Sequence, residues 1–338
     1  MARRSDAPPL WRDARALAVV AQVLFVVLLA AGIWTAKTVV ERSMARQNIR
    51  MDWAFFRQPA GFQLTALTWT VDLKHFSLKH YSPEDSYAEA MIAGLFNTMK
   101  VAALGIVLAM LMGLTVGVAR LSRNWLVSRL ALAYVEALRN TPLLVQLFFW
   151  YFAVFLQLPQ GTPENPAIIL LNGLVVLTNR GLAVGGMMTE HFGRQAVDGG
   201  FQMTSEFVAL VAGLAVYTSA FIAEIIRGGI LAIPRGQTEA ARSVGLSYSQ
   251  ALRLVVMPQA LRVIIPPLGN QCLNLTKNSS LAIGIGFADL LTASMTVASQ
   301  SFRALETFTF VTLAYLALSL LISAVLNMIR ARLALPGT

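Results

Sequence analysis

Residues 234–258 read PRGQTEAARSVGLSYSQALRLVVMP and connect two long apolar stretches of the chain. The first residues of this connection suit the start of a short helix, and Gly245 suits its end, because glycine readily adopts the left-handed conformation that closes helices. Ser247 and Gln250 have the spacing of a capping box, which predicts a second short helix that Pro258 then limits. Taken alone, this pattern also fits an ordinary amphipathic loop, so the rest of the chain has to decide between the two interpretations.

The composition of the whole chain is typical of a membrane protein. Of its 338 residues, 56% are hydrophobic and 13% are charged, against roughly 25% charged residues in soluble domains. A soluble chain of this length needs more polar residues to cover its surface. The single cysteine, Cys272, cannot form an internal disulfide, which excludes a disulfide scaffold. We therefore expect an all-α polytopic membrane protein.

Five apolar runs and a weaker sixth run predict the membrane helices. The five lie at residues 17–36, 101–119, 130–157, 208–233 and 307–329, and the sixth, which contains prolines and polar residues, at 258–285. Each is long enough to cross a hydrocarbon core of about 30 Å as a helix. In the second run, Gly113 and Gly117 have the spacing that allows close helix packing.

The positions of the basic residues predict the topology. The net charge is +10, and most basic residues flank the apolar runs. Since short basic loops mark the cytoplasmic side, we expect both termini and residues 234–258 in the cytoplasm and residues 41–90 outside. Only one further apolar candidate lies within residues 158–206, where an even number of crossings is required, so this segment is interpreted as an external insertion. No basic stripe with interleaved aromatic residues indicates a nucleic-acid partner.

The spacing of residues 239–258 decides the interpretation of the polar connection. It reads E-A-A-x₃-G-x₉-V-x-M-P and resembles the EAA loop of ABC importer permeases, E-A-A-x₃-G-x₉-I-x-L-P, with conservative departures at Val255 and Met257. Three further segments resemble motifs of the polar amino-acid permeases: LRNTPLLVQ at 138–146, SAFIAEIIRGG at 219–229 and KNSSL at 277–281. Within that family, DSY at 85–87 and RLSRNWL at 120–126 are most similar to the general L-amino acid subgroup.

The resemblance implies a fold and a division of the chain. The fold is that of a type I ABC importer (MetI-like) permease core of five helices, here with one extra N-terminal helix. Three parts follow: an N-terminal cytoplasmic tail with the extra transmembrane helix, an external segment, and the importer transmembrane domain, at residues 1–40, 41–90 and 91–335. The last part contains the external insertion 158–206 and the cytoplasmic coupling loop 234–258.

The resemblance also implies a function and its partners. The chain is expected to be the permease subunit of an ATP-driven, binding-protein-dependent amino-acid importer of the bacterial inner membrane, working by alternating access. The implied partners are a cytoplasmic ABC ATPase homodimer, a second permease that is a non-identical sister, a periplasmic amino-acid-binding protein and membrane lipid. The chain has no G-x₄-G-K-[ST] sequence, so ATP and Mg belong to the partner ATPase. No cofactor or metal is expected on this chain, because its three histidines lack ligand spacing.

Three groups of residues are candidates for the site. The resemblance gives the ATPase-coupling role to Glu239, Ala240, Ala241 and Gly245. Gate or structural roles are expected for two i,i+3 charged pairs and a proline: Glu136 with Arg139, Glu224 with Arg227, and Pro142. Polar residues at membrane depth are candidates for the substrate path, since a zwitterionic amino acid needs polar partners: Asn97, Gln146, Asn270, Gln271, Asn274, Lys277, Asn278 and Ser279. Alternatively, these polar residues satisfy backbone groups that Pro266 and Pro267 free, or Lys277 extends to the outer interface.

Other classes of membrane protein fit less well. A channel would show a repeated filter-like segment, and a secondary carrier often shows two similar halves. An intramembrane enzyme would need paired aspartates, a Ser/His pair or H-E-x-x-H at membrane depth. An ABC exporter usually carries a fused ATPase and no EAA loop. Within the importers, the substrate is left open between glutamate and glutamine, a broad set of L-amino acids, and a modified amino acid such as an opine.

Overall fold

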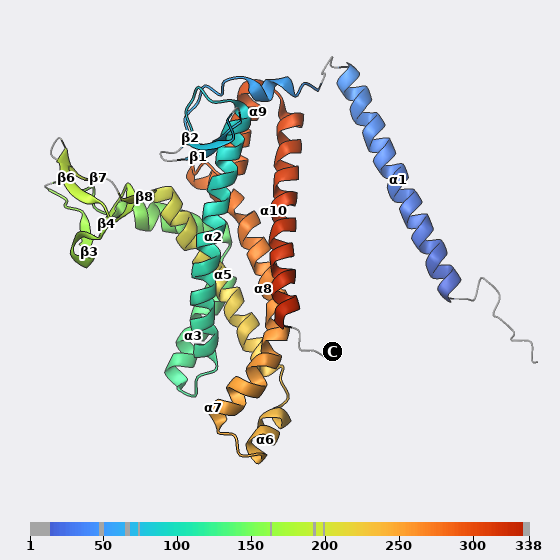
Figure 1. Ribbon diagram of the computed structural model, residues 1–338, viewed down its shortest axis with the longest axis vertical. Coiled ribbons are helices and arrows are strands. Elements are labelled where there is room, and N and C mark those ends of the chain that lie inside the picture. The colour runs from blue at the N-terminus through green and yellow to red at the C-terminus, as the bar shows by residue number, and fades with distance from the viewer. Residues whose placement is uncertain are drawn as a thin grey trace, which may run out of the picture. The chain divides into compact units, whose positions relative to one another are not determined.

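The computed structural model describes residues 14–46, 51–64, 68–73, 75–162, 164–191, 194–198 and 200–333. The chain divides into two units, Met1–Trp53 and Ala54–Thr338. The first unit contains helix α1, Ala14–Arg46 (Figure 1). From residue 17 onward its side chains are exposed or half-exposed, and this part is long and apolar enough to cross a membrane. A helix that is apolar all round needs lipid or protein around it.

Four long helices form the frame of the second unit. They are α2 (Tyr87–Arg120), α5 (Ser205–Leu231), α8 (Met257–Asn278) and α10 (Ala304–Leu333). Helix α2 packs on α5, α5 on α8, and α8 on α10. A 3₁₀ turn, Ser279–Ile285, and the short helix α9, Leu290–Ser301, connect α8 to α10. With α1, these helices supply five candidate membrane spans among the described residues, which agrees with the polytopic helical fold that the sequence predicts.

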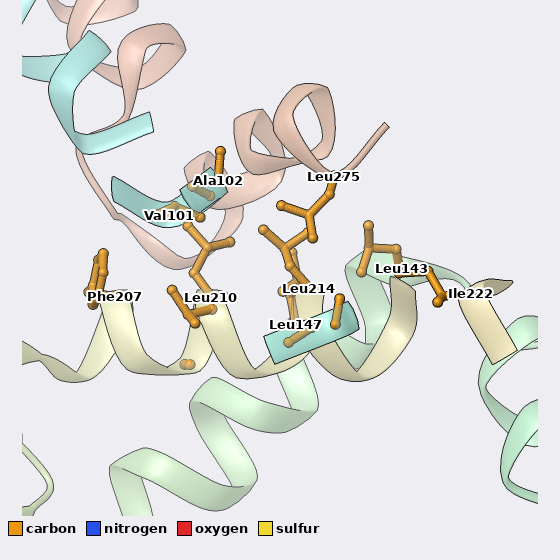
Figure 2. Packing of buried hydrophobic residues seen from close by; sticks show 14 of the residues in the cluster. Val101, Ala102, Leu143, Leu147, Phe207, Leu210, Leu214, Ile222 and Leu275 are labelled. Carbon is orange, nitrogen blue, oxygen red and sulfur yellow. The ribbon is translucent and has the colours of Figure 1, made fainter. Parts of the chain in front are cut away.

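The core of the second unit lies where α2 and α5 cross. Figure 2 shows Val101 of α2, Leu210 and Leu214 of α5, and Leu275 of α8 converging there. The predicted glycine pair lies at the same contact: a Cβ added at Gly113 would lie 2.5 Å from Ile222 Cγ2. At Gly117 it would lie 2.9 Å from the carbonyl oxygen of Ala223. The two helices therefore approach more closely than larger residues would allow, as the glycine spacing predicts.

The third apolar run is not one helix, which corrects the prediction for residues 130–157. It forms α3, Trp125–Arg139, and α4, Leu143–Phe148, and the two directions differ by 104°. After α4 the chain continues as a π-helical segment, Phe149–Val154, and a 3₁₀ turn, Phe155–Gln157. Pro142 lies at the bend, because proline restricts the residue before it and has no N–H for a helical hydrogen bond.

Short strands form the parts that the sequence analysis treated as external segments. A 3₁₀ turn, Ala54–Arg57, precedes the hairpin of β1 (Trp69–Asp72) and β2 (Ser77–His80), which packs against α2. Between residues 158 and 206, four antiparallel strands pair in the order β3-β4-β5-β8, and β6 pairs with β7. Their bounds are β3 Ile168–Leu170, β4 Val175–Thr178, β5 Gly181–Val184, β6 Met187–His191, β7 Arg194–Asp198 and β8 Phe201–Thr204, with a 3₁₀ turn, Leu171–Gly173, after β3.

Two short helices lie at the end of the second unit opposite the β1–β2 hairpin (Figure 1). They are α6, Arg235–Ser243, and α7, Tyr248–Ala251. The expected stop at Pro258 is wrong: α7 continues through a π-helical turn, Leu252–Val256, directly into α8. Pro258 is accommodated in the first turn of α8, directly after the π-helical turn, where the regular hydrogen-bond ladder of the helix is interrupted.

Candidate functional site

Helix α6 ends as the sequence predicts. Gly245 has φ +91°, and its N–H donates to the carbonyl of Arg242 at 3.0 Å. The N–H of Leu246 donates to the carbonyl of Ala241 at 3.2 Å, so the open end of the helix is satisfied. An L-residue at this φ would be strained. Gly245 thus turns the chain sharply between α6 and α7.

The E-A-A residues of α6 divide between its two faces. Ala241 is buried, whereas Glu239 and Ala240 are exposed. The Glu239 carboxylate forms no ion pair or hydrogen bond with any side chain that the structure describes. Beside it, Val244 is 79% exposed, and Tyr248 and Leu254 are also exposed. Exposed apolar side chains with polar groups around them are typical of a surface that binds another protein.

Helix α6 is tied to the membrane helix that follows it. The amide of Gln259 in α8 donates to Gln237 Oε1 in α6 at 3.3 Å. Helix α6 also packs on the π-helical turn Leu252–Val256, which is continuous with α8. The predicted capping box is present, because Ser247 and Gln250 each bond the other's backbone N–H. Helix α6 is therefore joined to α8 by a hydrogen bond and by packing.

Glu224 joins α2 to α5. Its carboxylate contacts Arg227 one turn along α5 at 3.0 Å, which confirms the predicted pair. It also contacts Arg120 at the end of α2 at 3.0 Å. All three side chains are partly buried, so charge-assisted hydrogen bonds hold the two helix ends together. The sequence analysis assigned no site role to Arg120, because 104 residues separate it from Glu224.

The expected pair of Glu136 with Arg139 does not form. Instead, the Arg139 guanidinium lies 5.2 Å from the centre of the Phe221 ring on α5. The reason is tertiary: Arg139 ends α3, α3 packs on α5, and an aromatic face attracts a guanidinium. Glu136 is exposed to solvent. Pro142 starts α4 just beyond, at the bend between α3 and α4.

Three of the expected substrate-path residues share one face of α8. Asn270, Asn274 and Lys277 are spaced four and three residues apart and are all exposed. Gln271 and Asn278 are half-exposed next to them. Lys277 forms no ion pair with any side chain that the structure describes. Because polar and charged groups within a membrane helix face protein or a cavity rather than lipid, this face of α8 requires a polar environment outside the chain.

Three other expected path residues lie inside the chain. The Asn97 amide donates to the carbonyl of Ala288 at 2.9 Å, and Ser279 Oγ donates to that of Thr276 at 2.8 Å. The Gln146 amide donates to the carbonyls of Leu138 and Thr141, at 2.8 and 3.1 Å. These side chains bond backbone carbonyls within the chain, but none of these carbonyls is one that Pro266 or Pro267 leaves without a helical donor, and the Gln146 bonds support the bend between α3 and α4.

No group of three His, Cys, Asp or Glu side chains suited to a metal ion occurs among the described residues. The groups assembled by the fold are therefore of two kinds. One is an exposed surface of α6 that carries Arg235, Glu239 and Arg242, with exposed apolar side chains following it, and the other is an exposed polar face on α8; partly buried ion pairs join helices α2 and α5.

Comparisons with known proteins agree with this arrangement. Residues 105–335 match the family model of the binding-protein-dependent transport system inner membrane component. The chain is 36% identical to the general L-amino acid transport system permease protein AapQ of Rhizobium johnstonii, covering 93% of this chain and 91% of that protein. It is 32% identical to the glutamate/glutamine/aspartate/asparagine transport system permease protein BztB of Rhodobacter capsulatus, covering 94% and 93%.

The solved structures include one with a similar fold. A chain from the crystal structure of an amino acid ABC transporter with histidines superimposes with a TM-score of 0.55 and 31% sequence identity. The match covers 73% of this chain and 95% of that chain. The extra N-terminal helix and the importer-type core that the sequence predicts are consistent with these matches.

Proposed function

The chain belongs to the family of binding-protein-dependent transport system inner membrane components, and from this membership we propose that it forms half of a path that imports L-amino acids. Family membership makes it a multi-pass permease subunit of an ABC importer, working with an ATPase and a substrate-binding protein. It is a transport subunit and not an enzyme. The finer assignments below concern its own residues.

Helix α6 is the element that couples the chain to the ATPase. The observation that carries this assignment is the exposed carboxylate of Glu239, which has no partner among the described side chains. It lies on a short helix that is bonded to α8 through Gln237 and Gln259. When ATP closes the ATPase dimer, the α6 helices of two permeases move together, and each α8 moves with its α6. The cavity between the permeases then opens outward. Coupling between distant sites requires such an element with two arrangements.

The charged side chains near α6 hold the cytoplasmic ends of the helices together, so that these ends open and close as one unit. Glu224 with Arg120 and Arg227 holds α2 to α5, and Arg139 on Phe221 holds α3 to α5. Because these contacts join three helices, a movement of one helix end is shared by the others. Pro142 keeps the chain bent at the point where α3 meets α4.

The polar face of α8 lines the substrate path. Lys277 supplies a positive charge for a carboxylate, and the amides of Asn270 and Asn274 supply donors and acceptors for the rest of a zwitterion. A second permease facing this surface would remove it from lipid and complete the path. The substrates are glutamate and glutamine or a broader set of L-amino acids, which the names of the two relatives support.

The assembly consists of this chain, a non-identical sister permease, an ATPase homodimer and a periplasmic amino-acid-binding protein in a lipid membrane. ATP and Mg are bound by the ATPase, and this chain binds no cofactor. Both termini lie in the cytoplasm, on the side of α6.

Purification of the tagged chain from its native membrane in mild detergent tests the assembly. The expected result is co-purification of a soluble ATPase that contains a phosphate-binding loop, together with a second permease of different sequence. The same ATPase without a sister would indicate a homodimer. Isolation of the chain alone, under conditions that preserve a control importer, would contradict the proposal and favour a secondary carrier.

A further inference from the structure

The β1–β2 hairpin and strand β8 meet over the first half of α2 and enclose a pocket of about 290 Å³. The hairpin contributes Trp69 and His80, whose ring centroids lie 4.1 Å apart. Strand β8 contributes Phe201, which is exposed at the rim. Small-molecule sites are mostly clefts of roughly 300–1,000 Å³, so this pocket has the size for a small metabolite.

A lysine without a counter-ion lies in the wall of this pocket. The Lys100 ammonium donates to Asn97 Oδ1 over 3.4 Å and forms no ion pair with any side chain that the structure describes. Asn97 is fixed in turn, because its amide donates to the carbonyl of Ala288 at 2.9 Å. An ammonium group has three N–H donors, and partial burial without an anion is unfavourable. The pocket therefore favours a ligand with a negative group near Lys100.

The remaining walls combine two aromatic residues with polar and aliphatic ones. Phe207 and Phe287 are buried in the pocket wall, with ring centroids 5.8 Å apart. Among the described residues that line the pocket, none is acidic. One cation beside aromatic surface suits a carboxylate attached to an uncharged organic group, and the absence of an acid disfavours a cationic side chain.

We propose that this pocket is an additional binding site for L-amino acids with uncharged side chains, formed within one permease chain and separate from the polar face of α8. The carboxylate binds Lys100, and the ammonium group and the side chain lie against Trp69 and Phe201, because aromatic faces attract cations and apolar groups alike. The inference rests on the proposed import of amino acids. It gives the hairpin and strand β8 a common role, which is to line a ligand site at the end of the bundle opposite α6.

Cysteine protection tests the pocket without relying on transport. The only native cysteine, Cys272, is buried, so Gln202→Cys places an accessible thiol in the pocket lining while both aromatic walls remain. The complex with its partner subunits is placed in lipid nanodiscs and treated with a charged methanethiosulfonate reagent. Saturating L-leucine is expected to slow modification about tenfold, whereas L-lysine is not. Leu171→Cys, in the exposed turn after β3, is the control and should react equally with and without L-leucine. Equal rates for Gln202→Cys would overturn the proposal.

Substitution of the two unpaired lysines locates the bound ligand. In the Gln202→Cys chain, Lys100→Gln should raise the half-protecting L-leucine concentration at least about tenfold, the effect of losing one charge-assisted hydrogen bond, and Lys100→Arg should largely preserve it. Lys277→Gln should leave protection unchanged. Loss of protection in Lys277→Gln but not in Lys100→Gln would place the ligand on α8 and contradict the pocket. If Lys100→Gln does not fold, Trp69→Ala at the exposed rim provides the same test.

The two proposals fail in different ways. Wild-type ATP-driven uptake of L-leucine without protection of Gln202→Cys would refute the pocket and leave the importer intact. Absence of uptake of any amino acid by the complete complex would refute the proposed function itself.

Discussion

The two ends of the second unit satisfy their charged groups in opposite ways. At the α6 end, the Glu239 carboxylate has no partner among the described side chains, and Val244 beside it is exposed. At the hairpin end, Lys79 contacts Asp85 at 2.7 Å and Glu89 at 3.2 Å. The Lys79 cluster is complete within the chain, whereas Glu239 is left without a partner among the described side chains. The comparison distinguishes the hairpin end, where this cluster stabilises the fold, from the α6 end, which is proposed to act through a partner.

The largest effect is expected at the α6 end, where the Glu239 carboxylate has no partner among the described side chains. Glu239→Arg should reduce ATP-driven uptake to the background of cells that lack the transporter, because it reverses the charge at the centre of the proposed ATPase surface. Membrane insertion and expression should be unchanged, since Glu239 makes no contact that the fold needs. Glu84→Arg, an exposed acid at the hairpin end, is the matched control and should leave uptake near the wild-type rate. Full uptake by a well-expressed Glu239→Arg chain would refute the coupling assignment.

The next effect concerns the packed helices that join the two ends. Gly113→Leu should destabilise the protein by about 2–3 kcal/mol, because side-chain atoms would overlap Ile222 at the contact of α2 with α5. The loss is measured as a lower melting temperature in detergent. Gly228→Leu is the control, since nothing lies within 4 Å of a Cβ at that position. Equal melting temperatures for the two variants would show that α2 and α5 do not pack as described.

A smaller effect is expected at the hairpin end. Lys79→Met should lower stability by about 1–2 kcal/mol, because Asp85 and Glu89 would remain partly buried without their cation. Lys37→Met removes only an exposed pair with Glu41 at 3.8 Å and should change little. A Lys79→Met chain as stable as the Lys37→Met chain would contradict the view that this end is held by its own contacts.

The pH dependence of the Lys79 contribution has a definite sign. Burial lowers the pKa of Lys79, but its hydrogen bonds to Asp85 and Glu89 and their charges outweigh burial and raise that pKa. A raised pKa in the folded state gives stability that is complete below the ordinary lysine pKa and is lost as the pH rises through the folded value. The difference between wild type and Lys79→Met should therefore stay constant from neutral pH until strongly alkaline pH, in melts recorded across that range.

The smallest effect is expected at α6 itself, where the glycine that ends the helix can be compared with a glycine inside it. Gly245→Ala should cost about 1–2 kcal/mol locally, because φ +91° is unfavourable for an L-residue. Gly236→Ala lies inside α6 with open space around it and should stabilise the helix slightly. Uptake and melting temperature should both fall for Gly245→Ala and not for Gly236→Ala. The opposite order of uptake rates would argue against Gly245 as the required turn.

Local sequence signals predicted the short helices of the α6 end well. The left-handed stop at Gly245 and the capping box of Ser247 with Gln250 each depend on a few neighbouring residues, and both are present. The ion pair of Glu224 with Arg227 was predicted for the same reason, since helical spacing alone brings the two side chains together. The long helices followed from apolar length.

Contacts between distant segments could not be predicted from the sequence. Arg139 binds the Phe221 ring instead of Glu136 because α5 packs against α3, which no spacing reveals. Strands β3, β4 and β5 are short and mostly apolar, so the sequence of residues 158–206 showed one apolar candidate segment and not the pairing of strands. The role of Asn97 is set by a carbonyl 191 residues away. In each case the partner lies on an element whose position depends on the whole fold.

The π-helical turn Leu252–Val256 determines the direction in which α6 points relative to α8. Each residue of an α-helix advances the chain by about 100°, so a single inserted or deleted residue in this turn would rotate everything before it relative to α8. The side chains of α8 would keep their places while α6 pointed in a new direction. The number of residues in this turn, more than their identity, therefore determines where α6 faces. Variation in length should be rarer here than variation in sequence.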